Sequence, residues 1–233
     1  MSTVEGISET SQLVPPAGNP KIEKMNLINN VCALLYIGII SYCCFANGVS
    51  LFSFHPLFMS IGFIIFMTTA INAVTPGDFA TEWMPIRLRS ARHWVLQLIA
   101  ITFTLAGFII IVANKIINDK LHFVSLHGKF GLASVIFTCI TSVGGIGALF
   151  SLKLKNILAP TYTKLIHAFI GLTTLCLGIF TIILGQFSPW WSFGEGSRYS
   201  GLFLVLIIMV LTNLRPSLKV YFRLKDRLGY NNN

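Results

Sequence analysis

The fold is decided by residues 51–74, which read LFSFHPLFMSIGFIIFMTTAINAV and carry no Asp, Glu, Lys or Arg. A helix rises about 1.5 Å per residue, so a run of this length crosses a hydrocarbon core of about 30 Å. Five more apolar runs have a similar length. They lie at about 27–47, 93–113, 127–150, 165–187 and 200–218. The sequence therefore predicts an all-α membrane protein with six transmembrane helices.

The composition of the whole chain agrees with that fold class. Of the 233 residues, 54% are hydrophobic and 11% are charged, and the mean hydropathy is +0.74. Six spans of about 20 residues occupy about half the chain, which leaves no room for a separate soluble domain of ordinary size. The composition thus excludes a tethered catalytic domain, a nucleic-acid-binding module and a secreted disulfide scaffold.

The predicted spans divide the chain into three parts. Residues 1–25 are polar and rich in Pro, Gly and Asn near their end, and we expect them to form a disordered cytoplasmic tail. Residues 26–220 form the six-helix transmembrane domain, and residues 221–233 form a second cytoplasmic tail. The Asn47-Gly48 pair and Ser50 make the only break between the first two spans. These two helices should therefore form a tight antiparallel hairpin.

Lys and Arg are distributed unequally between the two ends of the predicted bundle. Thirteen lie at the end that holds both termini and the loops 75–92 and 151–164, and only four lie at the other end. The positive-inside rule therefore places both termini in the cytoplasm. This topology and attraction to anionic headgroups account for the net charge of +9 without a nucleic-acid partner. We expect an endomembrane, endoplasmic reticulum or vesicle, rather than the plasma membrane.

Four of the five histidines lie near the start of four consecutive spans: His55, His93, His127 and His167. Because successive helices run in opposite directions, His55 and His127 enter from the non-cytoplasmic face, and His93 and His167 enter from the cytoplasmic face. A single intramembrane histidine is commonly satisfied by a neighbouring hydroxyl or carbonyl group. Four in this alternation favour a shared cause, since ionisable side chains are costly at such depth.

Two imidazoles that face each other across a bundle suit the iron of a b-type haem, which takes two axial nitrogens. A zinc site would need further ligands, and neither leaflet offers Cys, Asp or Glu at a matching depth. We therefore predict that spans 2 to 5 form a core four-helix bundle holding two haem b groups. The irons would lie on the order of 20 Å apart along the membrane normal. Such a pair can relay single electrons across the bilayer.

Three glycines lie at helical spacing from these histidines. Gly131 and Gly171 each follow a predicted ligand by four residues, and Gly62 follows one by seven. Each therefore shares the helix face of its histidine, and we expect all three to leave room for a flat macrocycle. The alternative is that they pack helix against helix.

Four segments surround the histidines. They read SLFSFHPLFMS from Ser50, RHWVLQL from Arg92, HFVSLHGKFG from His122 and KLIHAFIGL from Lys164. These segments resemble the cytochrome b561 family, and most of all its short members, the cytochrome b561 domain-containing transmembrane reductases. The resemblance covers about residues 27–220.

The resemblance implies a six-helix bundle with two b haems, with His55 paired with His127 on the non-cytoplasmic side and His93 with His167 on the cytoplasmic side. It also implies an activity. Electrons would pass from cytoplasmic ascorbate to monodehydroascorbate radical or ferric iron on the other side of the membrane. Family members are commonly dimers, so the resemblance implies a homodimer as well.

Ascorbate is an anion, so cations should lie beside the cytoplasmic histidine pair. Those within a turn or two of the pair in the sequence are Arg87, Arg89, Arg92 and Lys164. The alternative is that they contribute only to the positive-inside signal. The segment INAVTPGDFA at 71–80 replaces the ALLVYRVFR stretch of the vesicular family members, a departure that bears on the donor.

On the non-cytoplasmic side, His122 takes the place of an Asn of the family. The vesicular members carry the motif NxxSLHSW, where this chain reads HFVSLHGK. That Asn looks like an acceptor contact in the family, so we expect His122 to contact the acceptor or to move a proton with the electron. An exposed loop histidine is the alternative.

Two other functions are alternatives to a reductase with its own donor and acceptor. The first is an electron-carrying haem subunit that serves a partner protein. The second is a haem-free proton or metal-ion transporter, which would need water-lined polar residues along the spans. The segments between the two histidine pairs are instead mostly Ile, Leu, Phe and Thr.

Overall fold

The computed structural model describes residues 20–46, 48–74, 79–81, 85, 88–191 and 193–227. In these ranges every regular element is a helix. The elements are α1 (Pro20–Phe45), α2 (Leu51–Ser60), the π-helical segment η2 (Ile61–Met67), α3 (Thr68–Asn72), the 3₁₀ turn η3 (Phe79–Thr81), α4 (Arg89–Ile117), α5 (Leu126–Leu149), α6 (Pro160–Gln186) and α7 (Gly194–Arg227). Because α2, η2 and α3 follow one another without a break, they form a single span.

Six helical segments of the described chain are long and apolar enough to cross a membrane. They are α1, the continuous segment α2–η2–α3, α4, α5, α6 and most of α7. This confirms the predicted all-α fold with six transmembrane helices. Several helices extend beyond the predicted apolar runs, because a helix needs no apolar side chains outside the hydrocarbon core.

The two ends of the described chain differ from the predicted boundaries. α1 begins at Pro20, inside the stretch 1–25 expected to be a tail. Proline is well tolerated in the first turn of a helix, where its missing N–H would have no partner. α7 continues through Pro216 to Arg227, past the predicted domain end at 220. The remaining parts of the two expected tails, residues 1–19 and 228–233, lie outside the described residues.

The connection between α1 and α2 is short, as the sequence predicts for a tight hairpin. Gly48 has a φ of +100°, a conformation that glycine adopts far more readily than other residues. Ser50 then caps α2: its hydroxyl accepts the backbone N–H of Ser53 at 3.3 Å, and the Ser53 hydroxyl accepts the backbone N–H of Ser50 at 3.2 Å. This reciprocal capping ends the turn and starts the second span.

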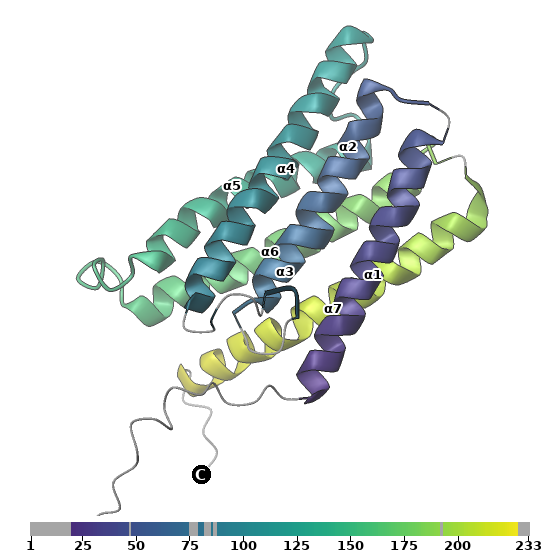
Figure 1. Ribbon diagram of the computed structural model, residues 1–233. Helices are drawn as coiled ribbons and strands as arrows, with labels where there is room; N and C mark the ends of the chain where they lie inside the picture. Colours follow the sequence, from purple (N-terminus) through teal and green to yellow (C-terminus); the bar gives the residue numbers. More distant parts are fainter. Residues whose placement is uncertain are drawn as a thin grey trace, which may run out of the picture.

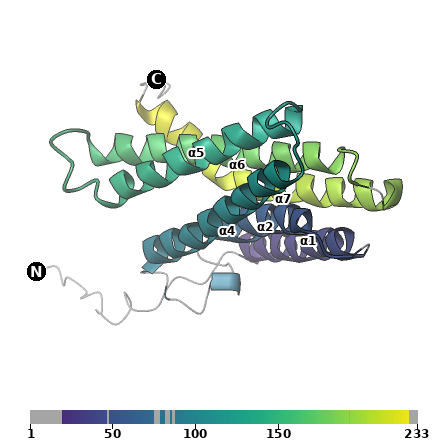
Figure 2. The same cartoon turned by 90° about the horizontal axis from the view of Figure 1, so that it is seen from above.

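The helices pack in antiparallel neighbours. α5 lies along α6, the α2–η2–α3 span lies along α4, and α1 lies along α7. Figure 2 shows α5 and α6 together on one side of the molecule and α4, α2 and α1 on the other. The predicted core of spans 2 to 5 thus corresponds to α2–η2–α3, α4, α5 and α6. α1 and α7 pack against one flank of that core.

The most deeply buried apolar side chains join α1, η2, α6 and α7. Tyr36, Ile64, Leu175, Ile179 and Ile208 are fully buried and belong to one continuous cluster. This cluster fixes η2 and α6, which carry or adjoin the histidines, against the two flanking helices.

Candidate functional site

In the structure, the four predicted histidine ligands lie together in two pairs. The ring centres of His55 and His127 are 6.1 Å apart, with the ring planes at 82°. Those of His93 and His167 are also 6.1 Å apart, at 88°. A metal–imidazole nitrogen bond is about 2 Å long and the ring centre lies about 1 Å beyond that nitrogen, so two rings that share one metal have centres about 6 Å apart. Both pairs have the spacing that one metal centre requires.

Hydrogen bonds to backbone carbonyls orient three of the four rings. Nδ1 of His55 donates to the Gly107 carbonyl at 3.0 Å, and Nδ1 of His93 donates to the Ala70 carbonyl at 2.9 Å. Nδ1 of His127 donates to the carbonyl of Thr181 at 3.0 Å. A carbonyl can only accept, so Nδ1 carries the proton in each ring and Nε2 is free to bind a metal. A ring whose Nδ1 donates to a backbone carbonyl in this way is typical of metal-binding histidines.

His167 differs from the other three in its hydrogen bonding. Its Nδ1 is buried and has no hydrogen-bond partner among the described residues. Thr141 on α5 lines the same cavity as this ring. His167 instead is closely packed on α5, where a Cβ added at Gly145 would lie 3.3 Å from its Cε1.

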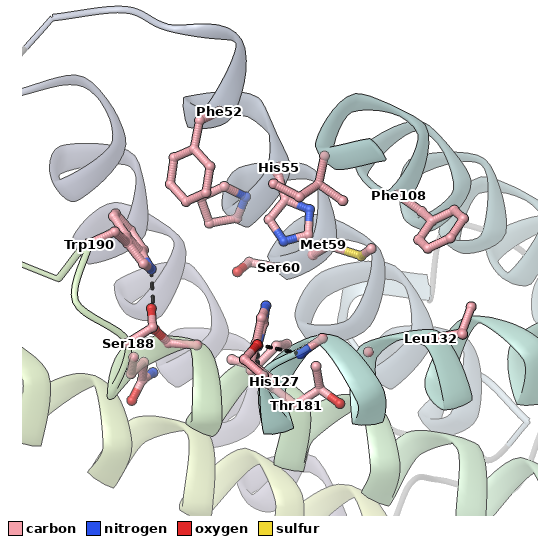
Figure 3. Close-up of a pocket in the computed structure, with 18 of the residues that line it drawn as sticks. Phe52, His55, Met59, Ser60, Phe108, His127, Leu132, Thr181, Ser188 and Trp190 are labelled. Carbon is pink, nitrogen blue, oxygen red and sulfur yellow. Dashed lines mark hydrogen bonds between the residues drawn. The ribbon is translucent and has the colours of Figure 1, made fainter. Parts of the chain in front are cut away.

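A cavity of about 290 Å³ lies beside the His55–His127 pair, at the lower end of the usual range for small-molecule and cofactor pockets. Figure 3 shows His55 and His127 pointing toward each other across it, with Phe52, Met59 and Phe108 among the residues around them. The lining is mostly apolar and comes from α1, α2, η2, α4, α5, α6 and the loops at that end. An apolar cavity between two facing imidazoles fits a haem.

The glycines expected to face the macrocycle do not all do so. Gly131 lines the cavity, and a Cβ there would have only the Thr181 methyl, at 3.4 Å, within 4 Å. Gly62 lies elsewhere: a Cβ on it would come within 2.7 Å of the Thr104 hydroxyl and 3.0 Å of the Ala100 carbonyl on α4. For Gly62 the helix-packing alternative is therefore correct.

The His93–His167 pair has a smaller neighbouring cavity. It measures about 140 Å³, lies between α5 and α6, and is lined by His167 and Gly144 among others, but not by His93. Gly171 does not line it; a Cβ there would rest 3.6 Å from the Thr141 methyl group on α5. Gly171 therefore also contributes to the close contact of α5 with α6.

The four cations expected at the cytoplasmic pair have different surroundings. Arg89, the first residue of α4, and Lys164 on α6 are exposed. Arg92 is only 4% exposed, and its guanidinium donates to the Thr81 hydroxyl at 3.4 Å. Arg92 thus packs against η3 instead of facing open solvent. Arg87 lies outside the described residues.

His122 lines the cavity beside the His55–His127 pair, together with two residues that sequence reasoning did not single out. Lys115, at the end of α4, is one; its ammonium donates to the Leu121 carbonyl at 2.6 Å. Gln186 is the other; its amide donates to the Tyr36 hydroxyl at 2.8 Å, while its Oε1 is buried without a partner among the described residues. The lining includes no Asp or Glu, so Lys115 makes this end of the cavity cationic.

A sequence model of the eukaryotic cytochrome b561 family matches residues 54–192, which include all four paired histidines. The chain belongs to the cytochrome b561 family. Haem b is the cofactor that this membership implies, in agreement with the facing imidazoles. The match begins one residue before His55 and ends just after Trp190 and Trp191, which line the larger cavity.

Named members of the cytochrome b561 family are similar over most of this chain. Transmembrane reductase CYB561D2 of Mus musculus is 34% identical over 167 residues, which is 72% of this chain and 74% of that protein. Probable transmembrane reductase CYB561D1 of Homo sapiens is 27% identical over 184 residues, 76% of this chain and 80% of that protein. Lysosomal membrane ascorbate-dependent ferrireductase CYB561A3 of Homo sapiens is 28% identical over 142 residues, 60% of this chain and 57% of that protein.

Proposed function

We propose that this protein is a di-haem transmembrane reductase that moves single electrons from cytoplasmic ascorbate to an acceptor on the other side of the membrane. His55 and His127 bind one haem, and His93 and His167 bind the other. The observation that carries this proposal is the pair of 6.1 Å ring separations. Each pair is contributed by two helices that enter from the same side.

The two histidine pairs lie about four turns of α-helix apart along the length of the bundle. Gly107, which bonds His55, lies on the same helix as His93, and the stretch of α-helix from residue 93 to residue 107 is about 21 Å long. Each haem would supply reversible one-electron chemistry. The protein's own part is to hold the rings, fix their tautomers and exclude water with apolar side chains such as Met59 and Leu132.

On the cytoplasmic side, we infer that the donor is an anion of the ascorbate type. Arg89 and Lys164 are exposed near the starts of α4 and α6, which carry His93 and His167. Both cations can attract such an anion. Arg92 stabilises the neighbouring segment through Thr81, and Arg87 remains a prediction from the sequence. A relative whose name includes ascorbate-dependent ferrireductase supports this choice of donor.

On the non-cytoplasmic side, the acceptor is monodehydroascorbate radical or ferric iron. His122 and Lys115 at the cavity provide a titratable ring and a cation, which suit an anionic radical or an anionic ferric chelate. Both termini are then cytoplasmic, as the positive-inside rule predicts, in an endomembrane. A homodimer is part of the same proposal by resemblance.

The proposal is tested by a visible absorption spectrum of the detergent-purified protein, with haem quantified per chain before and after ascorbate. We expect about two low-spin b haems that ascorbate reduces with saturation kinetics. His93→Ala should remove one of the two and leave the His55–His127 haem in place. Folded protein that stays colourless after haem supplementation would overturn the proposal. Slow, non-saturating reduction would instead indicate a subunit that serves a partner protein.

A further inference from the structure

The carbonyls that orient the histidines lie in a repeated register. Nδ1 of His55 donates to Gly107, which stands at position i+14 when His93 on the same helix is position i. Nδ1 of His127 donates to Thr181, which stands at i+14 when His167 is position i. Each ring is therefore held by a carbonyl of the neighbouring antiparallel helix, at i+14 from that helix's own histidine. We call this spacing the i+14 register.

The same register relates His167 to α5. Thr141 stands at i+14 from His127 and lines the same cavity as His167. This spacing is close to four turns of α-helix, because one turn takes about 3.6 residues. A histidine and the carbonyl at i+14 thus lie on nearly the same helix face, one at each end of the span.

His93 departs from the i+14 spacing by one residue, although its ring is hydrogen-bonded in the same way. Its Nδ1 donates to Ala70 at 2.9 Å, and Ala70 stands at i+15, not i+14, from His55. In a regular α-helix one additional residue turns the carbonyl by about 100°, away from His93. This span, however, contains the π-helical segment η2 between His55 and Ala70.

A π-turn closes each hydrogen bond over five residues instead of four, so a π-helical segment accommodates one residue more than the α-helix it replaces. The residues beyond it keep the face that they would have in an uninterrupted α-helix with one residue fewer. η2 therefore returns Ala70 to the position that the i+14 register specifies.

Contacts around η2 stabilise the wide turns. The Thr68 hydroxyl donates to the Ile64 carbonyl at 2.6 Å and lies 3.3 Å from that of Ile65, so it satisfies carbonyls within the π-helical segment. Gly62 permits the close approach of α4 at this level. The ring of Phe66 stacks on Phe103 of α4 at 5.6 Å.

We propose that η2 is a register device, which absorbs one extra residue so that His55 and Ala70 on the same span both meet their partners on α4. The Gly107, Ala70 and Thr181 carbonyls are positioning groups for the ligand rings. This inference rests on the proposed function, because it takes the rings as haem ligands.

Two single-residue deletions of matched apolar residues test this inference. Ile65 lies within η2, and Ile101 lies on α4 between His93 and Gly107; both are partly buried. Deletion of Ile65 should turn the π-helical segment into plain α-helix with Ala70 still in register. Deletion of Ile101 shortens the interval from His93 to Gly107 by one residue, on a helix that has no wide turn to absorb the change.

We expect the Ile65 deletion to keep two haems per chain and both reduction potentials, whereas the Ile101 deletion loses haem from at least one pair. Loss of haem from both deletions to the same extent, failure of the Ile65 deletion to fold, or two haems in both would each overturn the proposal. If wild type binds no haem, the proposed function fails instead. The melting temperatures of the haem-free proteins then decide the register: the Ile65 deletion should match wild type and the Ile101 deletion should melt lower.

Discussion

Gly145 and Gly185 leave the space in which the α5 and α6 histidines stand. A Cβ added at Gly185 would lie 3.2 Å from Cε1 of His127, and one at Gly145 would lie 3.3 Å from Cε1 of His167. Each glycine is on the helix opposite the ring that it faces. A side chain at either position would push the ring away from its partner across the bundle. Each glycine therefore helps to set the position of a histidine ring on the neighbouring helix.

We predict that Gly185→Val lowers haem occupancy at the His55–His127 pair and leaves haem at the His93–His167 pair in place. Overpacking of this kind typically costs about 1–3 kcal/mol. Haem per chain and the separate reduction potentials of the two haems measure the effect. Gly38→Val on α1 is the matched control, because a Cβ at Gly38 meets nothing within 4 Å. Equal haem loss in both variants would show that the effect is not specific to the His127 ring.

At the scale of elements, hydroxyl groups join α5 to α6 between the two histidine pairs. Ser134 and Thr181 share a hydrogen bond of 3.0 Å, and Thr141 and Thr174 share one of 2.6 Å. Such bonds contribute to helix association in membranes, where apolar surfaces have no hydrophobic driving force toward each other. They hold α5 and α6 in the alignment that places the Thr181 carbonyl beside the His127 ring.

Thr141→Val removes one of these interhelical bonds without a large change in shape. We predict a loss of about 0.6 kcal/mol, and at most about 1.7 kcal/mol, in the free energy of unfolding. Denaturation of the purified protein in detergent measures it. Thr173→Val is the control, because Thr173 is only partly buried and its hydroxyl donates to the Phe169 carbonyl of its own helix. The prediction is wrong if both variants lose the same stability.

At the scale of the whole molecule, the antiparallel packing places one histidine pair toward each end of the bundle. The α4–α5 connection lies at the His55–His127 end, and the α5–α6 connection lies at the His93–His167 end. An electron that enters at one pair and leaves at the other therefore travels along the helices. The direction relative to the cell depends on which end is cytoplasmic.

Labelling of single introduced cysteines tests that orientation. Lys120 and Asn156 are exposed residues in the α4–α5 and α5–α6 connections. In sealed vesicles with the cytoplasmic face outward, a membrane-impermeant maleimide should modify Asn156→Cys at once and Lys120→Cys only after permeabilisation. The opposite pattern would reverse the proposed direction of electron flow.

Much of this architecture could be predicted from the sequence because it depends on position along the chain. Six spans follow from the lengths of the apolar runs, and the alternating direction of successive spans puts His55 with His127 and His93 with His167. The cations at the starts of α4 and α6 can also be predicted from their position along the chain. None of these features depends on how a helix is rotated about its own axis.

The sequence by itself therefore determined the number of helices and the depth of each histidine, since both follow from counting residues. Only the tertiary structure decided which face each helix presents. Gly62 packs on α4 instead of lining the cavity, Arg92 is buried against η3, and Lys115 joins His122 at the cavity. The physical reason is rotation: one residue turns a helix face by about 100°. The turn at η2 and the packing of neighbouring helices, which no local pattern specifies, set that rotation.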